Sequence, residues 1–456
     1  MLRKIYWYLR RFRLFYPVMG LLSAVIKPVR RRYNAYRERI DRERMKGRVS
    51  DMSTDDTGVA TIDRTDHGSM HPGSELGVNV SGYFASEKGM GEASRSDVRC
   101  LRAADIPFVL NNITDMLSSN SDHQLDEYMS DTNPYPVNLI HVNAGELPGF
   151  YRSKTPSYFD GRYNIAYWTW ELSRFPDEWA PHAGLVNEIW VPSTFVQETV
   201  SQAVSVPVMV MPHSIELPAF EVAATEVGLD RKNRSNKDRG GRDFTFLSIF
   251  DFHSMMARKN PGAVIEAYKT VFSLTDGCTL IIKCAHGDVY PKELSFLKRL
   301  AGGRNDIKIV DRVYSREETW KLISGCDCYV SLHRSEGFGL TIAEAMALGK
   351  PVIATGYSGN MDFMTHSNSY PIEYNLIEIE YNIVEIERDY VVYRKGSLWA
   401  DVDVESAAQA MRKIYDNYDA ACKVGEAAAK DMRERFGSAV IGDRIRKRLQ
   451  DVLGMG

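Results

Sequence analysis

A single stretch near the C-terminal end most restricts how this chain can fold. The apolar run 328–332 is followed by Ser-Glu-Gly-Phe-Gly-Leu at 335–340, by a helix-compatible segment at 341–347 and by a second apolar run at 350–355. This pattern predicts a strand, a glycine-rich turn, a helix and a second strand. Such a turn exposes backbone N–H groups at the N-terminus of a helix, where phosphates and sugar hydroxyls bind.

Two carboxylates frame this turn, Glu336 before it and Glu344 eight positions later inside the helix. An ordinary strand–helix turn would explain two glutamates at this spacing, but not the whole motif around them. The extended motif resembles the donor-site signature of retaining glycosyltransferases of the GT-B fold, family 4 type, also called glycosyl transferases group 1. The resemblance implies that Glu336 is a catalytic-site residue on the donor sugar and that Glu344 contacts the nucleotide ribose. It also implies backbone contacts to the sugar and the diphosphate from Phe338, Gly339 and Leu340.

The resemblance spans residues 77–435, is closest over 244–365 and is absent over 1–76. It implies an α/β protein of the GT-B fold, with two Rossmann-like domains facing across a cleft. The chain is then divided into a basic amphipathic membrane-surface segment (1–46), a flexible linker (47–76), an N-terminal acceptor domain (77–228), a linker (229–243), a C-terminal nucleotide-sugar domain (244–430) and a C-terminal helix (431–456).

Length and charge agree with this division. A chain of 456 residues is too long for one hydrophobic core, so two large domains are expected. The net charge of −3 conceals a basic head, because residues 1–46 hold 14 Lys and Arg against 3 Asp and Glu. The remaining body is therefore acidic, which argues against general nucleic-acid binding. Six cysteines without metal-ligand spacing indicate reduced thiols in a cytoplasmic protein.

The basic head contains an apolar run at 14–26, which is too short to cross a bilayer and lacks a signal-peptide cleavage site. Aromatic residues and arginines surround it, a composition that suits a helix lying in a membrane interface with anionic lipids beside it. We therefore expect a cytoplasmic protein held peripherally at the inner face of the cell membrane. A helix that packs on the acidic body, or an arm that binds a partner, is the alternative.

A glycine-rich turn at 87–92 follows the first expected strand, 77–84, and precedes an amphipathic helix at 93–104. Gly89 and Gly91 in this turn would let the backbone approach a diphosphate closely. Two glycines alone are a weak signal. The resemblance adds weight to them, because it places the equivalent turn opposite the donor.

Two further candidates stand at strand ends. The strand 137–142 ends near His141, and the strand 164–171 ends with Glu171. Ligands bind beyond the carboxyl ends of parallel strands. Many members of the resembled family carry a catalytic-site His on the second of these strands, and this sequence has none there. Either Glu171 takes over part of that role, or His141 reaches in from the neighbouring strand; a structural, hydrogen-bonded His141 is the alternative.

The C-terminal domain offers a basic pair, Arg258 and Lys259, between the strand 244–252 and the helix 262–274. Arg presents a planar fork and Lys a point charge, so the pair suits a pyrophosphate. The resemblance implies a Lys at this place, which Lys259 supplies, and an Arg about six residues earlier, where His253 stands. The second phosphate contact is therefore assigned to Arg258, with a solvated surface pair as the alternative.

The sequence as a whole predicts a retaining hexosyltransferase. It would move a hexose, with mannose favoured, from a GDP- or UDP-sugar to a saccharide acceptor. The basic head favours a lipid-linked acceptor in cell-surface polysaccharide or O-antigen biosynthesis. Positive charge and backbone amides would stabilise the departing diphosphate, so neither a metal nor another cofactor is expected. The alternatives are a GT-B enzyme with a soluble acceptor, a nucleotide-sugar epimerase and a non-catalytic scaffold that keeps the fold.

Overall fold

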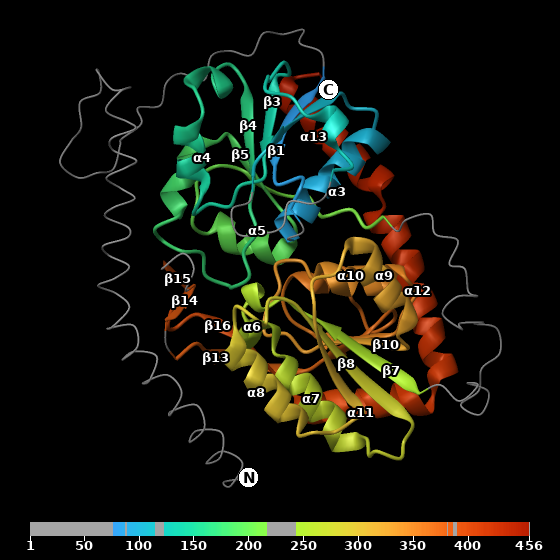
Figure 1. The fold of residues 1–456 in the computed structure, drawn as a ribbon. Coiled ribbons are helices and arrows are strands. Elements are labelled where there is room, and N and C mark those ends of the chain that lie inside the picture. The colour runs from blue at the N-terminus through green and yellow to red at the C-terminus, as the bar shows by residue number, and fades with distance from the viewer. Residues whose placement is uncertain are drawn as a thin grey trace. The chain divides into compact units, whose positions relative to one another are not determined.

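The computed structural model describes residues 76–86, 89–114, 123–216, 243–380, 382–385 and 390–455. These residues form two α/β lobes, each built on a six-stranded parallel sheet with helices on both faces (Figure 1). The fold class expected from the sequence is thereby confirmed. The expected membrane-surface segment and both expected linkers lie outside the described residues, apart from single residues at the linker ends.

The first lobe has the strand order β2-β1-β3-β4-β5-β6, and all neighbouring strands run parallel. The order reverses between β1 and β3, and ligand sites of open α/β sheets lie at such a reversal. The elements are β1 (Val78–Gly82), α3 (Gly89–Ala103), β2 (Phe108–Asn112), η1 (Asp126–Tyr128), β3 (Val137–Ile140), α4 (Leu147–Ser153), η2 (Pro156–Tyr158), β4 (Tyr163–Tyr167), η3 (Ala180–Leu185), β5 (Glu188–Val191), α5 (Thr194–Ser201) and β6 (Val208–Val210).

The edge strand β2 was not predicted from the sequence. Only two of its five residues, Leu110 and Asn111, are buried, so it lacks the apolar run that marks the inner strands. Its register is set by pairing with β1, which places Phe108 opposite Val78.

Successive residues of the inner strands point to opposite faces of the first sheet. Leu139 joins one buried cluster and Ile140 the other. The cluster that contains Leu139 also includes residues of α3 and of α13 (Ser438–Leu453), and these two helices lie side by side (Figure 1). The last helix is therefore part of the first lobe. An ion pair fixes it there, because Arg448 Nη2 lies 2.5 Å from Oε2 of the fully buried Glu188.

The second lobe has the strand order β12-β11-β10-β7-β8-β9, again with parallel neighbours. Its order reverses between β7 and β10, so a ligand site is expected beyond the carboxyl ends of these two strands. The elements are β7 (Phe244–Ile249), η4 (Phe252–Ser254), α6 (Met256–Lys259), α7 (Pro261–Val271), β8 (Cys278–Cys284), α8 (Pro291–Ala301), β9 (Ile307–Asp311), α9 (Arg316–Gly325), β10 (Cys328–Ser331), α10 (Leu340–Ala347), β11 (Val352–Thr355), η5 (Gly359–Asp362) and β12 (Tyr370–Ile372).

In the second sheet, too, successive residues of a strand point to opposite faces and so belong to different core clusters. Phe246 joins the cluster under α7, α8 and α11 (Val404–Asp416), whereas Leu247 joins the cluster under α9, α10 and α12 (Tyr418–Phe436). Local signals set several helix starts. For α9, Ser315 and Glu318 form a reciprocal capping box that satisfies N–H groups at the helix N-terminus.

A small antiparallel insert follows β12. It pairs β13 (Tyr374–Glu378) with β16 (Leu398–Val402) and β14 (Ile383–Glu385) with β15 (Tyr390–Tyr393). Tyr393 and Trp399 of this insert pack into the core cluster that contains Ile140 of the first lobe. The insert therefore contributes to a hydrophobic cluster shared by the two lobes.

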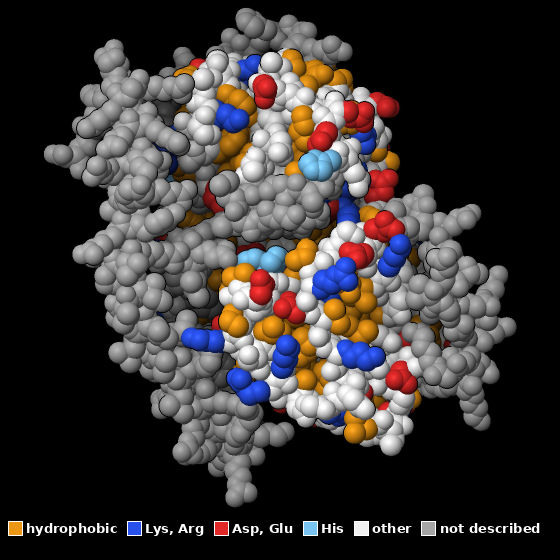
Figure 2. Space-filling model, viewed as in Figure 1, with side chains coloured by type: hydrophobic (Ala, Val, Ile, Leu, Met, Phe, Trp, Pro, Cys, Tyr) orange, Lys and Arg blue, Asp and Glu red, His pale blue; other side chains and the backbone are white. Residues whose placement is uncertain are grey.

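The surface of the described residues carries both positive and negative charge. On the face drawn in Figure 2, basic and acidic side chains are interspersed with hydrophobic ones, without a dominant patch of one sign. Among the described helices, none combines the length and the apolar character needed to span a membrane. All six cysteines are free thiols, and five of them are buried.

Candidate active site

The glycine-rich turn between β10 and α10 depends on two glycines for its shape. Gly339 has a φ of +95°, a left-handed conformation that only glycine adopts without strain, and it caps the N-terminus of α10. A Cβ on Gly337 would lie 2.8 Å from the backbone oxygen of Trp170 in the first lobe. Ser193 Oγ donates to the backbone oxygen of Gly337 at 2.6 Å. The turn therefore lies directly against the first lobe.

Glu336, Arg258 and Lys259 meet at the strand reversal of the second lobe. Oε1 of Glu336 lies 2.5 Å from Nζ of Lys259, and its Oε2 lies 3.2 Å from Nη1 of Arg258. Arg258 Nη1 also donates to the backbone oxygen of Ser335 at 2.9 Å. The basic pair lies at the end of α6, beyond β7, and Glu336 follows β10. Because these two strands are neighbours, residues 77 or more positions apart form one cluster.

Opposite charges in this cluster act against the effect of burial, which lowers the pKa of Lys259 while Glu336 opposes that shift. Burial by itself raises the pKa of Glu336, but Lys259 and Arg258 outweigh burial and lower the pKa to about 2. Burial lowers the pKa of Arg258, and Tyr393, Glu336 and Glu171 together raise it above its ordinary value. Glu336 is therefore ionised and Arg258 positively charged at neutral pH.

This coupling predicts a pH-dependent stability. The folded pKa of Glu336, about 2, lies below the value near 4.3 expected in the unfolded chain. Ionisation of Glu336 then contributes stability on the order of 3 kcal/mol above pH ~4.3, and this contribution is lost as the pH falls toward 2. At neutral pH we expect Glu336→Gln to unfold at lower urea concentration than the wild type. The free-energy difference between the two should shrink between pH 5 and pH 2.5; a difference that stays constant over this range would contradict the coupling.

Glu171 joins the same cluster from the first lobe. Its Oε1 lies 3.9 Å from Arg258 Nη2, and its Oε2 accepts a hydrogen bond from the Tyr393 hydroxyl at 3.1 Å. Its backbone oxygen also accepts from Ser335 Oγ. About a quarter of the Glu171 side chain, 27%, stays exposed. The structure thus brings Glu171 beside the predicted donor residues, and its contact with substrate stays a prediction.

His141 lies elsewhere. Its side chain has no exposed surface, and its Nε2 is 3.1 Å from Oδ2 of Asp97, which is equally buried. Its ring stacks on Tyr167 with 4.8 Å between centroids. A sugar could reach His141 only if the core opened. Its position therefore favours the structural alternative, a His that is paired within the fold, over the predicted contact with substrate.

Glu344 is buried inside α10 and faces α9. Its Oε1 accepts a hydrogen bond from Trp320 Nε1 at 3.0 Å and lies 3.8 Å from Arg316 Nη2. Burial raises the pKa of Glu344, and Arg316 opposes this shift. Arg316 also pairs with Glu92, in the first turns of α3. Arg316 and Trp320 were not predicted as site residues, because nothing near them in the sequence marks them as neighbours of Glu344.

Gly89 and Gly91 form the first turn of α3, beyond β1 and at the strand reversal of the first lobe. A Cβ on Gly91 would lie 2.2 Å from the backbone oxygen of Ser86, whereas the space around Gly89 is open. Gly91 is thus required by the tight turn itself. A backbone contact to a ligand stays a prediction for both glycines.

The other two motif residues offer their backbone rather than their side chains. The Phe338 side chain is buried, with its ring centroid 5.1 Å from that of His213 and 5.2 Å from that of Phe363. Leu340 is the first residue of α10 and packs against the hydrophobic cluster that contains Phe338 and Phe363. Backbone contacts of Phe338 and Leu340 to a ligand stay predictions.

A further support for the turn was not recognised in the sequence. His333 is fully buried, with its Nε2 3.1 Å from Oδ1 of Asn360, and Asn360 Nδ2 donates to the Thr355 backbone oxygen at 2.9 Å. Burial lowers the pKa of His333. The backbone N–H of Gly359 donates to the backbone oxygen of Glu336 at 2.9 Å. This network fixes η5 against the glycine-rich turn and so positions Glu336.

Comparison with solved structures identifies the fold. The fold is similar to that of sucrose-phosphate synthase from Thermosynechococcus elongatus, with a TM-score of 0.60, 13% identity and coverage of 84% of this chain and 100% of the other. It is also similar to Anabaena HepE, solved in complex with UDP and glucose, with a TM-score of 0.57, 15% identity and coverage of 82% and 100%. A glycosyltransferase from Rickettsia africae is similar with a TM-score of 0.56, 14% identity and coverage of 83% of this chain and 99% of the other. At these identities the likeness establishes the fold, GT-B.

The family assignment comes from the sequence of the second lobe. Residues 233–431 match the family model described as glycosyl transferases group 1. The match agrees with the resemblance over this part of the chain, and together with the GT-B fold it supports a glycosyltransferase. No curated protein matches the chain in sequence.

Proposed function

We propose that this protein is a retaining hexosyltransferase that uses a nucleotide sugar as donor. The observation that carries the proposal is the cluster of Glu336, Lys259 and Arg258 at the strand reversal of the second lobe, joined by Glu171 of the first lobe. It places two cations and two carboxylates beside the N-terminus of α10, whose backbone N–H groups suit an anionic or hydroxylated ligand. Anabaena HepE, which shares the fold, was solved with UDP-glucose.

The roles of the residues follow from their charges. Transfer breaks the bond between the anomeric carbon and the phosphate oxygen, so negative charge develops on the departing diphosphate. Lys259 and Arg258 would stabilise this charge, together with the backbone N–H groups after Gly339 and at Gly89. Glu336 would orient the sugar hydroxyls, and Glu344 would bind the ribose. Glu336 pairs with Lys259 at 2.5 Å and so holds this cation in place.

The acceptor is proposed from the sequence of the head. Residues 1–46 are strongly basic, and such a segment would attract the protein to anionic lipids at the inner face of the membrane. A lipid-linked saccharide in cell-surface polysaccharide or O-antigen biosynthesis would be presented at that surface. A soluble acceptor, or a nucleotide-sugar epimerase reaction, is the second candidate; the similar fold of a sucrose-phosphate synthase supports the soluble acceptor.

The donor can be tested by the thermal stability of the full chain with GDP, UDP, ADP and their hexose derivatives. A ligand that binds only the folded state at 100 times its Kd stabilises by about 2.7 kcal/mol, which raises Tm by several degrees. We expect one nucleotide to give this shift, and Glu344→Ala or Lys259→Ala to abolish it. Lys413→Ala, on the exposed surface of α11, should retain it. A folded protein that shows no shift with any of these ligands would contradict the donor site.

Product analysis separates the candidates. Incubation of the preferred nucleotide sugar with saccharide acceptors, free or lipid-linked, should release the nucleoside diphosphate and form a glycosylated acceptor with unchanged anomeric configuration. Conversion of the nucleotide sugar into its epimer without acceptor would support the epimerase. Binding without turnover of any acceptor would support a scaffold.

A further inference from the structure

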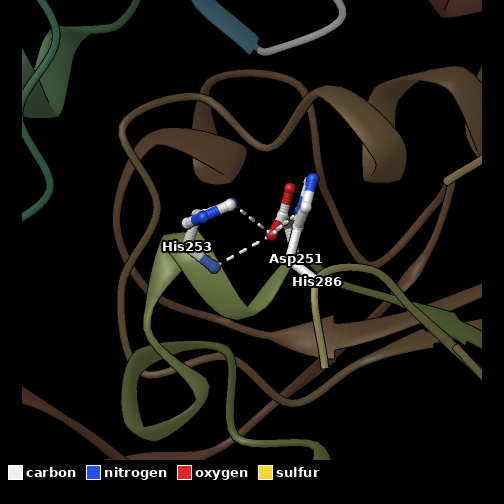
Figure 3. Close-up of side chains that lie close together, drawn as sticks. All are labelled: Asp251, His253 and His286. Atoms are coloured by element: carbon white, nitrogen blue, oxygen red, sulfur yellow. Dashed lines mark hydrogen bonds and ion pairs between the residues drawn. The ribbon is translucent and has the colours of Figure 1, made fainter. Parts of the chain in front are cut away.

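A second group of chemically reactive side chains lies at the carboxyl edge of the second sheet (Figure 3). Asp251 and His253 belong to the connection after β7, and His286 belongs to the connection after β8. The two strands are parallel neighbours, with Ile249 opposite Lys283, so their following connections leave the sheet side by side. The sheet topology therefore brings together residues that are 35 positions apart in the sequence.

The three side chains converge on a small volume. Nδ1 of His286 lies 2.9 Å and Nδ1 of His253 lies 3.4 Å from Oδ1 of Asp251. One donor atom from each residue lies within 4.8 Å of the other two. In a tetrahedral zinc site with bonds of about 2.0–2.1 Å, neighbouring ligand atoms are separated by roughly 3.4 Å. The three atoms can thus surround one ion after small side-chain rotations.

The backbone holds two of the ligands in place. The N–H of His253 donates to Asp251 Oδ1 at 2.9 Å, where Asp251 caps the short helix η4. His286 has a φ of +63°, a conformation that is uncommon for a residue other than glycine. This backbone conformation orients the imidazole toward Asp251, as Figure 3 shows.

The group is accessible but not freely solvated. The exposed fractions of the side chains are 33% for Asp251, 15% for His253 and 27% for His286. The rings of the two histidines approach to 4.1 Å between centroids. A second carboxylate stands nearby, because Asp311 Oδ1 accepts from the backbone N–H of Gly287 at 3.1 Å. Two cations lie over the Tyr314 ring in this region: the Lys283 ammonium is 5.2 Å and the Arg312 guanidinium carbon 5.5 Å from its centroid.

We propose that Asp251, His253 and His286 bind a divalent transition-metal ion of the zinc class. Two imidazoles and one carboxylate are a ligand set that Zn²⁺ accepts, and three protein ligands leave a fourth position for water or for an oxygen of a bound ligand. The set is poor for Mg²⁺ or Ca²⁺, which prefer oxygen ligands only. The ion would tie the connection after β7, which carries Arg258 and Lys259 in α6, to the connection after β8.

Metal content provides the first test. The tag-free full chain is purified, dialysed against Zn²⁺ and then against metal-free buffer, and its zinc is measured by mass spectrometry. We expect one Zn²⁺ for each chain. His286→Ala and His253→Ala should each weaken Zn²⁺ binding at least about tenfold, the loss that removal of even an outer-sphere partner can cause. His123→Ala, whose side chain is 69% exposed outside the cluster, is the matched control and should bind as the wild type does.

Cobalt substitution provides a readout that does not depend on zinc stoichiometry. Co²⁺ in the wild-type protein should give the intense visible absorption of a four-coordinate site, and Asp251→Asn, which keeps the shape of the side chain, should lose it. Circular dichroism shows whether each variant is folded. No zinc above the level of the folded His286→Ala variant, or a cobalt spectrum that Asp251→Asn leaves unchanged, would overturn the proposal.

This inference does not depend on the proposed hexosyl transfer, because both measurements can succeed when no nucleotide binds. Addition of the preferred nucleoside diphosphate to the Co²⁺ protein extends the test. A change in the visible spectrum would show that the fourth position takes a phosphate oxygen. An unchanged spectrum would assign to the ion the structural role of tying the two connections together.

Discussion

Replacement of Lys259 by Met is expected to lower kcat/KM for hexosyl transfer by about 10²–10³-fold. Lys259 Nζ lies 2.5 Å from Glu336 Oε1, beyond the carboxyl end of β7, where the charge of the departing diphosphate would develop. Met keeps the length and the apolar stem of the side chain and removes only the ammonium group. The loss should therefore fall mainly on the chemical step. Steady-state kinetics with the preferred donor measure it.

The matched control is Lys413→Met, which removes a charge from the exposed surface of α11. It should leave kcat/KM within about twofold of the wild type, since exposed charges contribute little at a distance. Near-normal activity in a folded Lys259→Met protein would show that this ammonium group does not stabilise the transition state. Arg258 would then carry the positive charge at the diphosphate alone.

Gly359→Ala is expected to destabilise the protein and to abolish most activity. The added Cβ would lie 2.2 Å from the backbone oxygen of Gly337 and 2.5 Å from its carbonyl carbon. Because these are backbone atoms, no side-chain rotation relieves the clash, and η5 must move away from the glycine-rich turn. Overpacking of this kind costs about 1–3 kcal/mol or more. The movement would also break the hydrogen bond from Gly359 N–H to the Glu336 backbone oxygen.

Urea unfolding and transfer kinetics measure the two effects of Gly359→Ala. Gly149→Ala is the control, since a Cβ on Gly149 in α4 meets no atom within 4 Å. Alanine in an open helical position should be neutral or stabilising by up to about 1 kcal/mol. A Gly359→Ala variant as stable and as active as Gly149→Ala would mean that η5 and the turn need not pack as closely as the structure shows.

Much of the candidate donor site was predictable because its signals are local. Glu336, Gly339 and Glu344 stand at fixed spacings in a strand–turn–helix unit, and the +95° φ of Gly339 explains why the motif contains glycine. The inner strands were predictable for the same reason, since parallel strands buried on both faces are continuous apolar runs. The edge strand β2 lacks such a run and was missed.

Positions that depend on distant contacts were not predictable. His141 follows a buried strand, as a ligand-binding residue would, but the structure buries it against Asp97 of α3. Conversely, Arg316 stands at the start of α9 without any motif, and the fold brings it beside Glu344. Sequence position alone could not separate these two cases, because each is decided by which face of an element its neighbours cover.

The sequence by itself determined the class of this glycosyltransferase, because the glycine-rich turn, its two glutamates and the Arg258–Lys259 pair form a pattern with local physical requirements. Only the tertiary structure decided which groups share a site. Strand β7 lies between β10 and β8 in the second sheet, so the connection after β7 has a neighbour on each side. With the connection after β10 it forms the Lys259–Glu336 pair, and with the connection after β8 it brings Asp251 to His286. Strand order is set by long-range packing, and no local sequence pattern encodes it.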